Sequence, residues 1–167
     1  ILIIIEWVDL VKNKLLIGTN GGAGKDRRIA KDDVKDDYRN IINFVQDKFK
    51  DNDIEIIYVV FSSGGGTGSG MGPLVIDLLT KKIPNKKFGA ITILPSIKES
   101  TVAQVNSIEC LRELVKLSVP TFIVDNEKYT AVNPTASRKQ LYDAVNNAVV
   151  DDFNLLLNTK RQSSKYG

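Results

Sequence analysis

The sequence has no histidine, and its only cysteine is Cys110. Without histidine, a Ser-His-Asp triad, a histidine general base and a histidine-ligated zinc site are all excluded. A single cysteine forms neither an internal disulfide nor a cysteine-only zinc site, which fits the reducing cytoplasm. Long apolar stretches are also missing, because the run from Ile54 to Phe61 contains Glu55 and is too short to cross a bilayer. We therefore predict a cytoplasmic protein without a membrane segment.

An excess of charge of one sign is missing as well. The 23 Lys and Arg residues oppose 20 Asp and Glu residues, which leaves a formal net charge of +3 with the signs interleaved. Direct nucleic-acid binding usually needs a concentrated basic surface, so we do not predict it. What the sequence does have is 167 residues, of which 43% are hydrophobic. A chain of this length and composition can bury a core large enough to fold without disulfides or metals.

Predicted strands and helices alternate along the chain. Apolar runs predict strands, and apolar residues at helical spacing predict amphipathic helices. We expect strands over residues 1–5, 14–17, 54–61, 88–94 and 120–124. We expect helices over residues 26–49, 73–82, 100–116 and 137–158. This order is typical of an α/β protein with a Rossmann-like, mostly parallel sheet and helices on both faces, here ending in a long helix.

A glycine-rich loop follows the strand predicted over residues 54–61. It reads Ser63-Gly64-Gly65-Gly66-Thr67-Gly68-Ser69-Gly70. Glycines let the backbone curl around an anion with its N–H groups inward, and the next helix adds free N–H groups and its dipole. Thr67 and Ser69 add hydroxyl donors. A flexible linker is the alternative, but the position between a core strand and an amphipathic helix favours phosphate binding.

The two common phosphate-binding motifs fit this loop poorly. Met71 stands where a Walker motif needs lysine, and the contiguous glycines differ from the spaced glycines of the dinucleotide fingerprint. A Rossmann-type, dinucleotide-dependent oxidoreductase therefore remains only an alternative function.

The loop instead resembles the signature of the tubulin/FtsZ superfamily of GTPases, as Gly64-Gly65-Gly66-Thr67-Gly68-Ser69-Gly70. Three further segments resemble family segments in the same order: Asn20–Gly24, Leu94–Glu99 and Val124–Asn126. The resemblance implies that GTP/GDP, with Mg²⁺, is the ligand. The residues that it implies for GTP binding are Gly21, Gly22, Ala23, Gly24, Gly64, Gly65, Gly66, Thr67, Gly68, Ser69, Glu99, Asn126, Tyr142 and Asn146.

The resemblance also implies individual roles. Glu99 would hold the ribose, Asn126 and Asn146 would read the guanine, and Tyr142 would stack on it. Tyr142 and Asn146 are one helical turn apart, so they share a helix face. Each residue has an alternative interpretation: Glu99 as a solvated acid near a helix start, Asn126 as a turn residue, and the other two as polar residues of a half-exposed helix. Lys25, Arg27 and Arg28 resemble phosphate partners, but a basic cluster more often forms a solvated face.

Within the superfamily, Ile93–Ser100 and Phe122–Asn126 are most similar to plasmid and phage tubulins. Ala103 stands where the cell-division members carry an arginine. The implied function is a GTPase that polymerises head to tail with copies of itself, for segregation of plasmid or phage DNA and with a DNA-binding adaptor as a possible partner. A cell-division polymer is the alternative within the family.

The resemblance also implies that the chain consists of three segments. Residues 1–136 would form a GTP-binding domain that is incomplete at its amino end, 137–158 the central helix and 159–167 the start of the next loop. The catalytic carboxylates would follow Gly167 and act on the neighbouring subunit, and the second domain would be absent. Because the family's first phosphate loop has no counterpart after Ile5, we expect a gap between Ile5 and Glu6.

Overall fold

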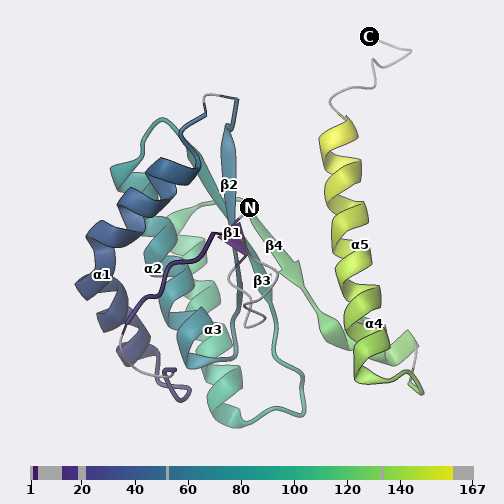
Figure 1. The fold of residues 1–167 in the computed structure, drawn as a ribbon. Coiled ribbons are helices and arrows are strands. Elements are labelled where there is room, and N and C mark those ends of the chain that lie inside the picture. Colours follow the sequence, from purple (N-terminus) through teal and green to yellow (C-terminus); the bar gives the residue numbers. More distant parts are fainter. Residues whose placement is uncertain (1, 4–12, 19–21, 52, 133, 160–167) are drawn as a thin grey trace. The chain divides into compact units, whose positions relative to one another are not determined.

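A computed structural model describes residues 2–3, 13–18, 22–51, 53–132 and 134–159 of the chain (Figure 1). The chain divides into two compact units, residues 1–123 and 124–167, and each is described by itself. The expected gap after Ile5 and the predicted site residue Gly21 lie outside the described residues. The strand predicted over residues 14–17 is wrong, because these residues have no regular secondary structure.

The sheet contains β1 (Leu2–Ile3), β2 (Ile56–Ser62), β3 (Lys87–Ile93) and β4 (Thr121–Val124) in that spatial order. Strand β2 is parallel to both β1 and β3, with Val59 opposite Leu2 on one side and Ala90 on the other. The rings of Tyr58 and Phe122 meet edge to face with centroids 5.6 Å apart. The predicted α/β class with a parallel sheet is confirmed.

Three helices belong to the first unit: α1 (Arg27–Lys48), α2 (Gly66–Lys82) and α3 (Thr101–Leu117). Helix α2 lies between α1 and α3, and the three pack against one face of the sheet (Figure 1). Asp26 and Ser100 are the N-caps of α1 and α3, and their side chains accept bonds from the N–H groups of Arg28 and Ala103. These two starts agree with the predicted ones to within one residue, because short polar caps are readable in a sequence.

The second unit contains α4 (Asn126–Val132) and α5 (Arg138–Thr159). Helix α5 matches the long helix predicted over residues 137–158, whereas α4 is not predicted. None of the described helices combines the length and apolar character that crossing a bilayer requires.

The core lies between β2, β3 and the three helices of the first unit. Its most buried members alternate along β2, as Ile57, Val59 and Phe61, and they pack against apolar residues of the helices. The buried helix residues in this cluster are Ala30, Val34, Ile41, Val45, Met71, Val75, Ile76, Leu79, Cys110 and Leu114. Burial raises the pKa of the Cys110 thiol to about 12, so the thiol stays protonated and serves as a core residue.

Helical spacing in the sequence predicts that Val105, Ile108, Leu111 and Val115 face the core from α3, but of these four only Leu111 packs against it. Val105, Ile108 and Val115 are 47%, 51% and 77% exposed. The buried positions are Ala103, Asn106, Ser107, Cys110 and Leu114. Most of these side chains are small, so the helix backbone can approach its neighbours closely.

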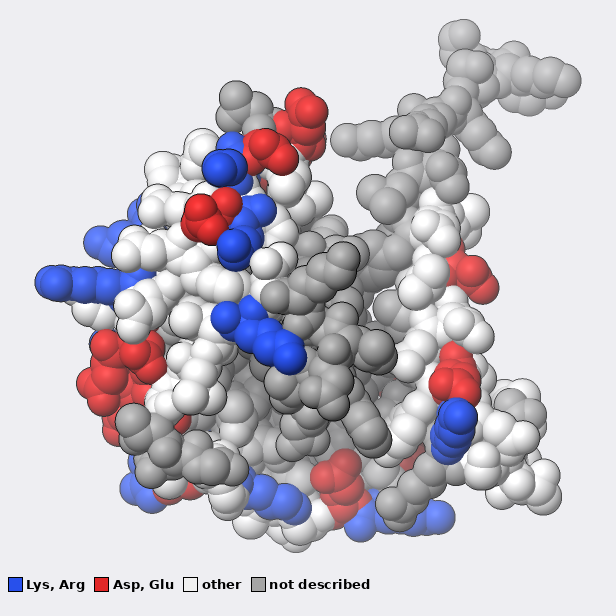
Figure 2. All heavy atoms as spheres, in the orientation of Figure 1, with Lys and Arg blue, Asp and Glu red and all other residues white. Residues whose placement is uncertain are grey.

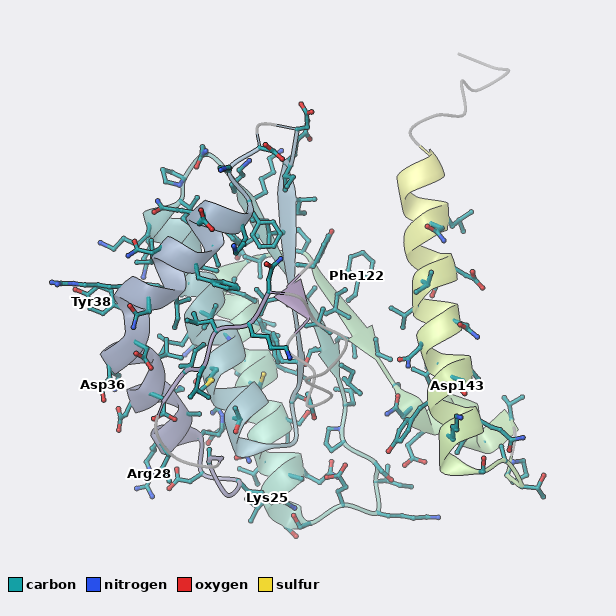
Figure 3. The ribbon with its side chains drawn as sticks, in the orientation of Figure 1. Lys25, Arg28, Asp36, Tyr38, Phe122 and Asp143 are labelled. Carbon is teal, nitrogen blue, oxygen red and sulfur yellow. The ribbon has the colours of Figure 1, made fainter. Side chains whose placement is uncertain are left out.

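The helical spacing of Tyr38 with Val34, Ile41 and Val45 predicts that it lies on the apolar face of α1, and this prediction is also wrong. Tyr38 is 37% exposed, and the Arg39 guanidinium lies 5.5 Å from its ring centroid. Figure 3 places Tyr38 and Asp36 on the outer side of α1.

Candidate functional site

Two glycine-rich loops meet in the first unit. Residues 22–24 precede α1, and residues 64–70 lead from β2 into α2. The Ala23 backbone N–H donates to the Thr67 hydroxyl oxygen at 3.4 Å. A Cβ atom added to Gly66 would lie 2.7 Å from the Asp26 nitrogen and 2.7 Å from the Lys25 carbonyl carbon. The two backbones can therefore touch only because position 66 carries no side chain.

The glycine-rich loop is itself the start of α2. The helix begins at Gly66, with Gly65 as N-cap, and not near Pro73 as the sequence predicts. The first turn of a helix leaves its N–H groups without a partner in the helix, so those of Gly66, Thr67 and Gly68 face outward from its end. Apart from Gly65 and its two chain neighbours, no described residue has an atom within 4 Å of a Cβ built on Gly65. Open space and outward N–H groups suit an anion.

The two hydroxyl groups of the loop differ. The Ser69 hydroxyl is buried and donates to the Gly65 carbonyl, so it is engaged inside the loop. Thr67 is exposed and accepts from Ala23. Of the two donors that the sequence suggests, Thr67 is therefore the one on the surface.

Pro73 leaves one backbone carbonyl of α2 without its usual helical donor, and Arg27 supplies a donor in its place. Because proline has no N–H group, Pro73 cannot bond the Ser69 carbonyl one turn earlier in α2. The Arg27 guanidinium donates to that carbonyl instead, from Nη2 at 3.0 Å and from Nε at 3.4 Å. It also pairs with Glu109 at 2.6 Å and Glu113 at 2.8 Å in α3. Arg27 is only 8% exposed, so it is neither a phosphate partner nor part of a solvated face.

The other two cations of this cluster lie near the N-terminal end of α1 (Figure 3). The Lys25 ammonium donates to the Ser100 hydroxyl at 2.8 Å. Arg28 is exposed and pairs with Asp26 at 2.8 Å. The hydrogen bonds from the side chain and backbone of Arg28 lower the pKa of Asp26 to about 2, so this N-cap stays ionised at neutral pH. Basic and acidic side chains are interspersed over the described part of the face in Figure 2.

A third segment, the loop between β3 and α3, lies beside the glycine-rich loop. A Cβ atom added to Gly64 would lie 2.8 Å from the Cβ atom of Pro95. Glu99, in the same loop, is exposed and accepts a bond from the Ser96 N–H at 3.3 Å. The first unit thus brings Gly22, Ala23 and Gly24 to the loop of residues 64–70, with the Glu99 loop adjoining it. The ribose contact of Glu99 stays a prediction.

Asn106 is not among the site residues predicted from the sequence. This residue of α3 is 6% exposed, and its side-chain amide donates to the Lys25 carbonyl at 3.0 Å and to the Gly64 carbonyl at 3.3 Å. It therefore contacts both glycine-rich segments at once. One feature of the sequence could have identified it: Asn106 is one helical turn from both Ala103 and Cys110, and this stripe of small residues is the buried face of α3.

The predicted base contacts all belong to the second unit. Asn126 is half-buried and is the first residue of α4. It is separated from β4 by Asp125, whose carboxylate accepts a hydrogen bond from the Glu127 N–H at 3.0 Å. Tyr142 is 56% exposed in α5, and Asn146 is exposed one turn later on the same helix. The structure thus places Tyr142 and Asn146 on one helix face, whereas contact of these residues with a guanine stays a prediction.

Comparisons with known proteins agree with this geometry. A family model described as "Tubulin/FtsZ family, GTPase domain" matches residues 8–134. The tubulin-like protein TubZ of Clostridium botulinum C phage is 32% identical over 112 residues, which cover 64% of this chain and 31% of TubZ. The solved structure of CetZ2 from Haloferax volcanii, described as a GTPgS-bound protofilament, superposes with a TM-score of 0.78 at 26% identity, covering 90% of this chain and 45% of CetZ2.

A second solved structure, CetZ from Methanosaeta thermophila, superposes with a TM-score of 0.72 at 28% identity. That match covers 83% of this chain and 37% of CetZ. The chain therefore spans about a third to a half of the length of these relatives.

Proposed function

The chain belongs to the tubulin/FtsZ family and matches the GTPase domain of that family. We propose that it binds GTP and takes part in GTP hydrolysis. The observation that carries the proposal is the meeting of two glycine-rich loops at the N-terminus of α2. The backbone N–H groups of Gly66, Thr67 and Gly68 face outward there, and the positive end of the helix dipole lies behind them. Phosphate groups are the ligands that such an arrangement favours.

We assign the rest of the nucleotide by the family resemblance. Glu99 would hold the ribose, Asn126 and Asn146 would bond the edge of the guanine, and Tyr142 would cover its face. The exposure of Tyr142 and Asn146 on one face of α5 supports this assignment, because both side chains are accessible to a ligand.

Mg²⁺ would accompany the nucleotide. Within the described part of the chain, no group of three or more Asp, Glu or Cys side chains is arranged to hold a metal ion. Magnesium in nucleotide sites keeps several waters and binds largely through substrate phosphates. The ion would therefore neutralise phosphate charge, while the backbone N–H groups of the loops orient the phosphates.

We propose that the whole protein assembles head to tail, and that a neighbouring copy supplies the carboxylates that orient the attacking water. A contact between two different surfaces does not close on itself, so it generates an open filament. The CetZ2 relative is described as a protofilament with GTPgS bound, which supports this proposal. The nucleotide would lie in the contact, so its state would control assembly.

Segregation of plasmid or phage DNA, through a DNA-binding adaptor, is the role that we propose for the filament. Two observations favour it over cell division. One relative is a phage protein. Ala103, which stands where the cell-division members carry arginine, is fully buried and lies next to Gly64, so this position has no room for a long charged side chain.

The first test of nucleotide binding is calorimetry of the full chain with GTP and ATP. A base site built on hydrogen bonds rejects an analogue that leaves its polar groups unpaired, and such discrimination reaches about 10⁴-fold. We expect GTP to bind at least about 100-fold more tightly than ATP. Equal binding of GTP and ATP would refute the roles of Asn126 and Asn146, and binding of NAD in place of GTP would favour an oxidoreductase.

Assembly is tested on the full-length protein by sedimentation with GTP, GDP, ATP or NAD. We expect pelleting with GTP alone and a GTP turnover that rises more steeply than linearly with protein concentration, because each active site needs a neighbour. Turnover that stays strictly proportional to concentration at high dilution would show instead that one chain completes the site.

A further inference from the structure

We propose that Asn106 is a positioning residue that sets the spacing of the two glycine-rich segments and thereby the affinity for nucleotide phosphates. The inference rests on the proposed function. It concerns a residue of α3 that lies outside the glycine-rich segments and acts through their backbone.

The bonding of Asn106 carries the inference. A side-chain amide has two N–H donors, and here one carbonyl partner belongs to each segment: Lys25 at 3.0 Å and Gly64 at 3.3 Å. Lys25 directly follows Gly22-Ala23-Gly24, and Gly64 opens the loop that starts α2. One planar group of fixed size therefore determines how far apart the two backbones lie.

A hydrogen bond and a close contact also join the two segments directly. The Ala23 N–H to Thr67 hydroxyl bond is long, at 3.4 Å, and it ends on an exposed side chain. The close approach of Gly66 to Lys25 and Asp26 sets a minimum separation but does not prevent the loops from moving apart. Arg27 holds the start of α1 to the Ser69 carbonyl farther along the loop, whereas Asn106 supplies the attraction that holds Lys25 and Gly64 at that distance.

Helix α3, which carries Asn106, is itself held in place by side-chain contacts. On the next turns, Glu109 and Glu113 pair with Arg27 at the start of α1. A binding group held by a buried side chain on a rigid helix is placed more accurately than one on a loop alone.

Removal of the amide has a defined consequence. The buried Gly64 carbonyl and the partly buried Lys25 carbonyl would each lose a donor, and the segments would shift to regain partners. Phosphate-binding N–H groups act only at short range and in the right direction, so a small shift lowers affinity. The guanine and ribose contacts lie elsewhere and would not change.

The test compares Asn106→Leu and Asn106→Ala with a matched control, Ser107→Ala, in the full chain. Leucine keeps most of the volume without the donors, and alanine is the variant most compatible with a helix. Ser107→Ala also removes a buried side-chain hydrogen bond, but not one to the loop carbonyls. Thermal melting first establishes that each variant is folded at the temperature of the binding assay.

We expect both Asn106 variants to weaken GTP and GDP binding at least about tenfold, the factor that one buried donor represents. Binding of guanosine, measured by competition, should change less than about twofold, and Ser107→Ala should change none of the three. An equal loss for guanosine would mean that Asn106 only supports the fold. Unchanged GTP binding in both Asn106 variants would overturn the inference.

Hydrogen exchange separates failure of this inference from failure of the proposed function. In the protein without ligand, Asn106→Ala should speed exchange of the amides of residues 22–24 and 66–68, and Ser107→Ala should not. If the unmodified chain binds no GTP, the proposed function fails, and the exchange rates still decide the spacing role. Equal exchange in the two variants would refute it.

Discussion

Gly65→Val is expected to abolish GTP binding and to leave the fold almost unchanged. The backbone of Gly65 is extended, with φ −79° and ψ 162°, a conformation that valine adopts readily. A Cβ atom there would have no described neighbour within 4 Å. The new side chain would instead occupy the open space at the N-terminus of α2, where we propose that the phosphates bind.

The expected size of the effect is large. Filling the phosphate position should weaken GTP binding by more than about 100-fold, which corresponds to about 3 kcal/mol. The melting temperature should stay within about 3 °C, because a substitution in open space changes the stability of a chain this long by little. Calorimetry with GTP and a thermal melt of the same sample measure both quantities.

Gly66→Ala is the matched comparison one residue later. Its Cβ atom would lie 2.7 Å from the backbone of Lys25 and Asp26, so the two glycine-rich segments must separate. Such overpacking costs about 1–3 kcal/mol, and the melting temperature should fall by about 3–10 °C. The two variants thus distinguish two roles of glycine. At Gly65 the absence of a side chain leaves room for the ligand, and at Gly66 it leaves room for the backbone of Lys25 and Asp26. If Gly65→Val binds GTP like the unmodified chain, the loop does not contact phosphates.

The contrast between these glycines shows what the sequence could predict and what it could not. The loop was recognisable because seven consecutive residues carry the family pattern, and its place between strand and helix follows from local periodicity. The sequence could not show why glycine is needed at position 65 for one reason and at position 66 for another. The atoms near Gly66 belong to Lys25 and Asp26, which are about 40 residues away in sequence.

Helices α2 and α3 show two further limits. Four glycines between residues 66 and 72 argue against a helix by propensity, and Pro73 suggested a start there. Packing of these residues against α1 and β2 outweighs that preference, so α2 starts at Gly66. In α3, the stripe of Val105, Ile108 and Val115 has the same helical period as the stripe that is buried. Periodicity alone could not choose between them, because the close approach of α3 favours small residues.

Arg27 was not predictable for a related reason. Its partners Glu109 and Glu113 are 82 and 86 residues away, and Ser69 is 42 residues away. In the sequence Arg27 is one of three neighbouring cations, yet it is the one that the fold buries. Its contacts join the starts of α1 and α2 to α3, so we expect it to matter for stability.

Arg27→Met should lower the free energy of unfolding by about 2–3 kcal/mol. Removing one member of a buried ion pair costs about 3–5 kcal/mol, and the lower value applies because Glu109 and Glu113 are 52% and 31% exposed and Lys31 still pairs with Glu113. The melting temperature should fall by about 5–10 °C. Arg28→Met is the control: Arg28 is 88% exposed, so no measurable change is expected.

The contribution of the Ser69 carbonyl to this loss can be isolated in the background of Pro73→Ala. Alanine restores the N–H group that proline lacks, so the Ser69 carbonyl regains a donor inside α2 and no longer depends on Arg27. Arg27→Met should therefore cost about 1 kcal/mol less in the Pro73→Ala chain than in the chain with proline, which is the net value of one buried hydrogen bond. Denaturant unfolding of the four chains measures this coupling. If the cost is the same in both backgrounds, the ion pairs with α3 alone account for the stability that Arg27 supplies. The hydrogen bond from Arg27 to the Ser69 carbonyl then adds nothing to it.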